Sequence, residues 1–397
     1  EKACRSIDYF LAEYGEDGCC DEGALYYRHA GLCLFNALEI LNAVTYGHFA
    51  SLYLEIKVRN IAAYLMNVHV QDKYYVNFAD CSPVPGRCSA REFLFARRTG
   101  NQEMAAFAAE DFMRGLPQTM LLPGENNLYY RLQNAFTVKE IVAYAAGVAE
   151  TPVDYTDIFY PSTGLFIARD AVYFLAVKAG CNGDSHNHND TGSFTIYKNG
   201  FPLLIDVGVE SYTKKTFSPQ RYEIWTMQSA YHNLPTVNGC MQKEGKIYKA
   251  VDTSTRFGEE SSEIRMNLAK AYPAQAGLKY YNRRAVLVKG QEIRIEDTFG
   301  FVEAADKNAD AADGAYDRKQ VILSLMTYER VVPAPQEQRE GLLLKIGDKG
   351  VIYVTGGRYV ETEEIPVTDQ RLKTAWEHAV YRTLIEAEGT SLAVRIC

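Results

Sequence analysis

The sequence predicts an α+β protein with a helical part followed by a part made of antiparallel sheet. Up to about residue 150, apolar residues repeat at spacings of three and four, which gives a helix one buried face. Beyond that point the chain consists of short β-branched and aromatic runs separated by turn residues, a pattern typical of antiparallel strands. We therefore expect a helical domain at 1–150 and a sheet domain at 151–397, with the boundary within 149–157.

The helical repeat is clearest in four segments, and loops rich in Pro, Gly and Asn at 81–90 and 121–127 separate the helices. The four segments are 32–44, 54–68, 102–115 and 138–149. This arrangement predicts a series of helical hairpins.

The second part contains at least six runs with strand character, at 171–177, 193–197, 202–208, 284–299, 341–347 and 350–357. Asn199-Gly200 lies between two of them and is the strongest hairpin signal, because both residues tolerate the positive φ of a two-residue turn.

Composition excludes several classes of protein. With 397 residues, of which 47% are hydrophobic, the chain can bury a large core. Its apolar runs are shorter than the roughly 20 residues of a membrane-spanning helix, so we expect no membrane association. A net charge of −8 argues against a nucleic-acid partner.

Cysteine usage and the start of the chain bear on its location. The nine cysteines contain no C-x-x-C pair and predict neither a disulfide framework nor a cysteine-based metal site. The first residues do not resemble a secretory signal. We therefore expect a cytoplasmic protein. The chain starts at Glu1 without a methionine, so we expect that it can be a processed product or a fragment, with a periplasmic or secreted location as the alternative.

The segment "CNGDSHNHNDTGSF" at 181–194 places His186, His188 and Asp190 at every second position. In an extended segment these side chains share one face. Imidazoles and a carboxylate suit zinc, but a polar, hydrogen-bonded loop explains the segment equally well.

Two other polar residues could join this segment. Asp206 follows an apolar run in "LLIDVG", where an acid is costly to bury unless it is paired or bound to a metal. His232 lies in "SAYHN". An ideal hairpin at Asn199-Gly200 sets Asp206 opposite Ser193, so the chain must bend near Gly192 to bring Asp206 to His188.

These motifs resemble the heparinase II/III-like polysaccharide lyases. That family carries H-x-H-x-D, then an apolar strand ending in Asp-x-Gly, then a His-Asn pair, as at 186–190, 203–208 and 232–233 here. Glu22, Gly23 and Tyr26 also match its E-G-x-x-Y segment. The resemblance covers nearly the whole chain and implies an α/α toroid, incomplete in this sequence, followed by an antiparallel β-sandwich.

The resemblance also implies roles for individual residues. His188, Asp206 and His232 would bind a metal, zinc being the expected ion. Asp190 would orient a histidine by a hydrogen bond from behind the ligands or serve as a turn residue. Tyr26 and His186 would be the catalytic residues. We assign substrate binding to Arg221, Arg28 and Glu22, of which Arg221 lies in the matching block and the other two lie near Tyr26.

The expected substrate is an acidic, uronate-containing polysaccharide or oligosaccharide, cleaved by β-elimination. The sequence departs from the family before Tyr26, where no asparagine or histidine stands to help neutralise the substrate carboxylate; the first asparagine is Asn36. The main alternative is therefore a non-catalytic protein that binds acidic glycans. A metal-dependent hydrolase on a β-sandwich is a third possibility.

Overall fold

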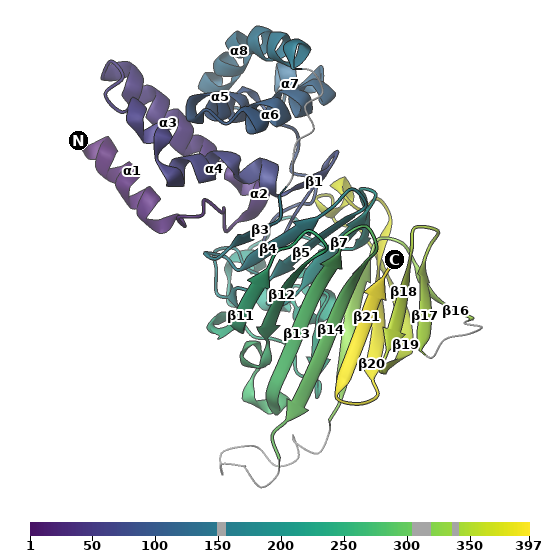
Figure 1. Cartoon of the computed structure of the whole chain (residues 1–397). Coiled ribbons are helices and arrows are strands. Elements are labelled where there is room, and N and C mark those ends of the chain that lie inside the picture. Colours follow the sequence, from purple (N-terminus) through teal and green to yellow (C-terminus); the bar gives the residue numbers. More distant parts are fainter. Residues whose placement is uncertain (149–155, 304–318, 336–340) are drawn as a thin grey trace. The chain divides into compact units, whose positions relative to one another are not determined.

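A computed structural model describes residues 1–148, 156–303, 319–335 and 341–397 of the chain (Figure 1). The chain divides into two compact units: Glu1–Tyr75 with Val84–Thr156, and Val76–Pro83 with Asp157–Cys397. The boundary predicted between residues 150 and 151 lies outside the described ranges. The short segment Val76–Pro83 comes from within the helical half of the sequence but belongs to the sheet unit.

The first unit is helical apart from a two-stranded ribbon, β1 (His69–Gln71) and β2 (Tyr74–Tyr75). Its helices are α1 (Lys2–Glu13), α2 (Gly23–Tyr27), α3 (Gly31–Val44), η1 (Ala50–Leu54), α4 (Ile56–Asn67), α5 (Ala90–Thr99), α6 (Gln102–Arg114), α7 (Gln118–Leu121) and α8 (Leu128–Gly147). Three predicted helices correspond to α3, α4 and α6, and the fourth is the second half of α8. None of the helices in the described ranges has both the length and the apolar character needed to cross a bilayer. The expected toroid remains a prediction.

The second unit contains two large antiparallel sheets (Figure 1). The nine-stranded sheet consists of β3 (Ile158–Tyr160), β4 (Leu165–Arg169), β5 (Tyr173–Lys178), β7 (Phe194–Lys198), β8 (Phe201–Leu204), β9 (Pro235–Val237), β15 (Val321–Thr327), β19 (Gly357–Pro366) and β20 (Ala379–Ala387). The eight-stranded sheet consists of β11 (Val251–Arg256), β12 (Ser261–Asn267), β13 (Leu278–Val288), β14 (Glu292–Phe301), β16 (Val331–Ala334), β17 (Leu342–Ile346), β18 (Gly350–Thr355) and β21 (Ser391–Ile396). A small ribbon pairs β6 (Cys181–Asn182) with β10 (Gly245–Lys249).

The hydrophobic core of this unit draws side chains from both sheets, as a β-sandwich requires. Phe166 and Leu175 of the nine-stranded sheet belong to the same buried cluster as Ile264, Leu287 and Val394 of the eight-stranded sheet. All six residues of β5 are buried, so this strand is covered on both faces. The predicted antiparallel sheet is confirmed, and its two layers form a sandwich.

The predicted hairpin at Asn199-Gly200 is also confirmed. These residues have φ of 49° and 76° and connect β7 to β8, where Lys198 pairs with Phe201. A register shift between Ile196 and Tyr197 then displaces the rest of the pairing by one residue. Because of this irregularity, an ideal two-strand ladder does not give the position of Asp206.

Candidate metal centre and active site

The three predicted metal ligands meet in the interior of the sandwich unit. One potential ligand atom from each of His188, Asp206 and His232 lies within 4.8 Å of the others. The two histidines are 0% exposed and Asp206 is 1% exposed. The sequence therefore predicted correctly that these three segments converge.

The backbone around the site explains how distant segments come together. His188 lies in the loop between β6 and β7, Asp206 follows the end of β8, and His232 follows the short helix η5 (Ser229–Tyr231). Gly192 adopts φ of 89° and supplies the predicted bend. Asn233 then fixes the arrangement, since its side-chain nitrogen donates to the backbone carbonyls of Phe194 and Ile205.

Two unpaired ring nitrogens at the site are suited to bind a divalent cation. Nδ1 of His188 and Nε2 of His232 are buried and have no hydrogen-bond partner in the described part of the chain. Leaving buried polar atoms unpaired is costly, and coordination of an ion would satisfy both nitrogens. Two imidazoles and one carboxylate form a common three-residue zinc set with a position left open.

The charge state of Asp206 agrees with a ligand role. Burial raises the pKa of its carboxyl, but the charge and hydrogen bond of His232 outweigh burial and place the pKa below its usual value. His232 Nδ1 lies 3.0 Å from Asp206 Oδ2. An ionised Asp206 can accept a hydrogen bond from His232 Nδ1, which leaves His232 Nε2 for an ion once that nitrogen carries no proton.

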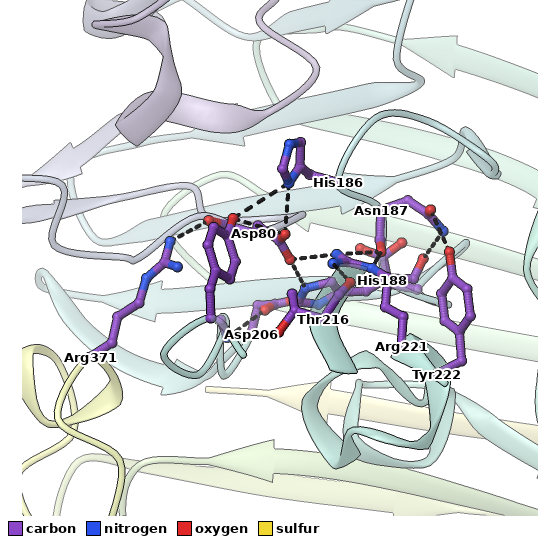
Figure 2. Close-up of polar contacts among 12 residues, drawn as sticks. Asp80, His186, Asn187, His188, Asp206, Thr216, Arg221, Tyr222 and Arg371 are labelled. Carbon is purple, nitrogen blue, oxygen red and sulfur yellow. Dashed lines mark hydrogen bonds and ion pairs between the residues drawn. The ribbon is translucent and has the colours of Figure 1, made fainter. Parts of the chain in front are cut away.

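A second carboxylate, Asp80, lies at the centre of a polar cluster beside these three residues (Figure 2). Its Oδ1 lies 3.1 Å from His188 Nε2 and 2.6 Å from Nη2 of Arg221. Its Oδ2 lies 2.9 Å from His186 Nδ1 and accepts a hydrogen bond of 3.0 Å from the Tyr212 hydroxyl. One buried carboxylate thus bonds a histidine of the triad and the predicted catalytic histidine.

Asp80 did not figure in the sequence-based site, although a signal was present. It ends the stretch "YYVNFAD", so it follows an apolar stretch much as Asp206 does, and the same cost of burying an unpaired acid applies. Burial raises the pKa of Asp80, but hydrogen bonds and charges from His188 and then Arg221 lower it well below its usual range. Asp80 is therefore an anion that compensates the cation Arg221.

Asp190 does not orient a histidine, contrary to the expected role. Its Oδ1 accepts a hydrogen bond of 2.8 Å from the Lys178 ammonium, and both side chains are buried. The predicted carboxylate function near His188 is performed by Asp80 instead. The motif pointed to the wrong acid because Asp190 is close in sequence, whereas Asp80 is 108 residues from His188.

Arg221 is largely engaged by the protein itself. Its side chain is 11% exposed, and it donates to Asp80 and to the backbone carbonyls of Asn187 and Thr216 (Figure 2). These bonds hold the loop after β8 against the histidine segment. The predicted substrate contact of Arg221 remains a prediction, whereas its role in orienting Asp80 is visible.

The remaining predicted site residues lie in the helical unit. Tyr26, within α2, is half-buried, and Glu22 precedes that helix. Arg28 forms an ion pair with Glu92 and donates to the carbonyls of Pro85 and Arg87. These contacts explain Arg28 as a residue that secures the loop before α5, without any substrate.

Solved structures with a similar fold carry the names heparinase III and heparan sulfate lyase. A heparinase III gene product has 16% sequence identity and a TM-score of 0.60, and the match covers 99% of this chain and 54% of that one. The heparan sulfate lyase of Pedobacter heparinus has 13% identity and a TM-score of 0.61, with the same coverage of 99% and 54%. This chain spans about half the length of these structures, and at such identities the likeness shows the fold alone.

A search of curated proteins found no match. The family described as "Heparinase II/III-like, C-terminal" matches residues 154–375, which is more than half of the chain and includes the metal-type triad. The chain therefore belongs to the heparinase II/III-like family.

Proposed function

We propose that this protein is a polysaccharide lyase that cleaves a uronate-containing acidic polysaccharide or oligosaccharide by β-elimination. The observation that carries the proposal is the site of the sandwich unit, where His186 joins the His188–Asp206–His232 triad through Asp80. Membership of the heparinase II/III-like family supports it. The His186 side chain is 28% exposed, so a substrate can reach it, whereas the triad is sealed from solvent.

β-Elimination at a uronic acid has three chemical requirements. The negative charge that develops on the carboxylate must be stabilised, the neighbouring C5 proton must be removed, and the departing sugar oxygen at C4 must receive a proton. Preorganised hydrogen-bond donors stabilise such a charge strongly in a site that excludes water. A tyrosine can supply the proton to the leaving oxygen, and it can remove the C5 proton if its surroundings favour the phenolate.

We assign these steps to His186 and Tyr26. His186 would contact the substrate carboxylate, and Tyr26 would act as acid, or as base and acid in turn. The bond between His186 Nδ1 and Asp80 sets the orientation of the imidazole. Arg221 and Glu22 are further candidates for substrate contacts, and Arg28 is a weaker one because its guanidinium is bonded to Glu92 and two carbonyls.

The proposed resident ion is zinc, held by His188, Asp206 and His232. An ion at this position supplies positive charge and cross-links three loops of the sandwich. The unpaired nitrogens of the two histidines support this assignment. The chemical steps themselves do not require the ion to touch the substrate.

The proposal is tested by incubating the purified chain with heparin, heparan sulfate, hyaluronan, chondroitin sulfate and alginate. Elimination creates an unsaturated ring that absorbs in the ultraviolet, so a lyase produces rising absorbance with at least one polymer. Tyr26→Phe should then lower kcat by about 10²–10⁴-fold, the usual contribution of a general acid or base. Tyr9→Phe is the matched control, because Tyr9 is 76% exposed on α1.

The alternative function is non-catalytic binding of acidic glycans. The buried triad and the family membership are compatible with binding as well as with catalysis. Under this alternative, the polymers bind but no absorbance develops. A hydrolase would instead release saturated products and lose turnover when the metal is removed.

A further inference from the structure

The two carboxylate oxygens of Asp80 bond different sets of side chains, which the sequence motif does not reveal. The carboxylate is completely buried, and its two oxygens have separate partners. Oδ1 faces His188 and Arg221, while Oδ2 faces His186 and Tyr212. The metal-ligand side and the substrate side of the site therefore meet on a single residue.

We propose that Asp80 is a positioning residue that sets the ring orientation of His188 for the metal and of His186 for the substrate at the same time. This inference rests on the proposed lyase function for the role of His186. It does not rest on that function for the role of His188.

On the metal side, Asp80 completes a carboxylate–histidine pair. His188 directs Nε2 at Asp80 Oδ1, and its other nitrogen, Nδ1, is buried without a partner. A metal-binding histidine commonly donates its second ring N–H to a carboxylate, which fixes the tautomer and makes the ligating nitrogen more basic. Asp80 thus makes Nδ1 the nitrogen available for the ion.

On the substrate side, the same carboxylate selects the tautomer of His186. Because Nδ1 lies 2.9 Å from the anionic Oδ2, the proton of a neutral ring is held on Nδ1. Nε2 is then the nitrogen at the opposite edge of the ring. The Tyr212 ring stacks on the imidazole at an interplanar angle of 25° and limits its rotation.

The surroundings hold Asp80 itself in place. Its backbone N–H donates to the carbonyl of His186, and its own carbonyl accepts a bond of 2.8 Å from Arg371 (Figure 2). Asn77, three residues earlier, donates to the backbone carbonyl of the ligand Asp206. The segment Val76–Pro83, which belongs to the sandwich unit, is therefore held by hydrogen bonds to both His186 and Asp206.

The test is Asp80→Asn in the metal-loaded protein. Asparagine keeps the shape but lacks the charge, so it can no longer accept from every partner. We expect the dissociation constant for zinc to rise and kcat at saturating zinc to fall, each by about 10–100-fold, the usual effect of losing such an outer carboxylate. KM should change little, and NMR of ¹⁵N-labelled histidine should show His186 as a mixture of tautomers.

Matched variants separate positioning from simple destabilisation. His186→Gln should lower kcat without changing zinc affinity. Asp111→Asn is the structural control, because Asp111 is also a buried carboxylate bonded by an arginine, Arg87, and by the backbone N–H of Cys88, but no hydrogen bond joins it to a histidine among the described residues. It should lower thermal stability and leave zinc affinity and the His186 tautomer unchanged.

The outcomes distinguish this inference from the proposed function. Unchanged zinc affinity and an unchanged His186 spectrum in Asp80→Asn would overturn the positioning role even if the wild-type chain is an active lyase. Weaker zinc binding and altered tautomers in a chain without lyase activity would support positioning and refute the lyase. If Asp80→Asn does not fold, Tyr212→Phe removes the hydroxyl that bonds Asp80 Oδ2 and also lies 3.4 Å from His186 Nδ1. It should alter the tautomer and kcat but not zinc affinity, and no change would overturn the substrate-side role.

Discussion

At the scale of single residues, the sequence identified the metal-type ligands but missed the acid that connects them to His186. His188, Asp206 and His232 were recognisable because a histidine pair, an acid ending an apolar strand and a His-Asn pair are local patterns. Asp80 also follows an apolar stretch, but no local motif connects it to His186, which is 106 residues away. Pairing over that distance depends on how the chain folds, which spacing along the sequence does not encode.

Replacing His188 by alanine is expected to remove the ion and to destabilise the sandwich unit. At about 100 times its dissociation constant, a bound ligand contributes about 2.7 kcal/mol to folding stability, or about 5–10 °C in Tm for a unit of this size. Metal analysis combined with thermal unfolding, with and without a chelator, measures both effects. A chelator should lower the Tm of the wild-type protein and leave the Tm of His188→Ala unchanged.

His378→Ala provides the control for this experiment, because the His378 side chain is 92% exposed. It should retain the metal and the wild-type Tm. Stoichiometric metal in His188→Ala with wild-type affinity would show that the three residues do not form the site.

At the scale of elements, the sequence predicted only part of the two sheets, and it missed both an apolar strand, β15, and a charged one, β19. The predicted runs correspond to β5, β7, β8, β13, β14, β17 and β18. β19 was missed because its sequence, "GRYVETEEIP", has mostly exposed or half-exposed residues and lacks a clear apolar alternation. Helix α5 was also missed, although Ser89 and Glu92 form a capping box at its start.

Gly192→Ala tests the bend that brings His188 to Asp206. Gly192 has φ of 89°, and a Cβ there would lie 2.5 Å from a Leu268 methyl carbon. Backbone strain of this kind costs about 1–3 kcal/mol, and the clash adds to it. We expect a lower Tm together with weaker metal binding, since the backbone shift moves His188.

Gly290→Ala is the matched control, because Gly290 has φ of 71° in the turn between β13 and β14 and no atom within 4 Å of the added Cβ. Its free energy of unfolding should fall by about 1–2 kcal/mol, because alanine is strained in the left-handed conformation, and it should bind metal normally. An equal decrease in the free energy of unfolding of the two variants, with metal binding intact, would mean that the bend at Gly192 does not position His188.

At the scale of the whole molecule, the sequence predicted the order of helical and sheet parts but not how the sandwich layers support the site. Arg283 on β13 pairs with Asp297 on β14, and its Nη1 also donates to the backbone carbonyls of Gly192 and Asn233. It therefore links the eight-stranded sheet to the loops that carry His188 and His232 of the triad. An arginine in an alternating strand is indistinguishable in sequence from a solvent-facing one, so this tie could not be predicted.

The last prediction compares two adjacent arginines of β13. The Arg283 side chain is 0% exposed, whereas that of Arg284 is 31% exposed and pairs with Glu263 and Glu296. Glu263 has a second ion-pair partner, Arg265, that remains when Arg284 is replaced. Arg283→Met leaves the buried Asp297 charge unpaired and should cost about 3–5 kcal/mol of unfolding free energy, measured with urea. Arg284→Met should cost no more than about 1 kcal/mol. Arg283 also donates to the carbonyls of Gly192 and Asn233, so Arg283→Met should weaken metal binding and Arg284→Met should not. Comparable metal affinity in both variants would show that these hydrogen bonds stabilise the fold without affecting the metal site.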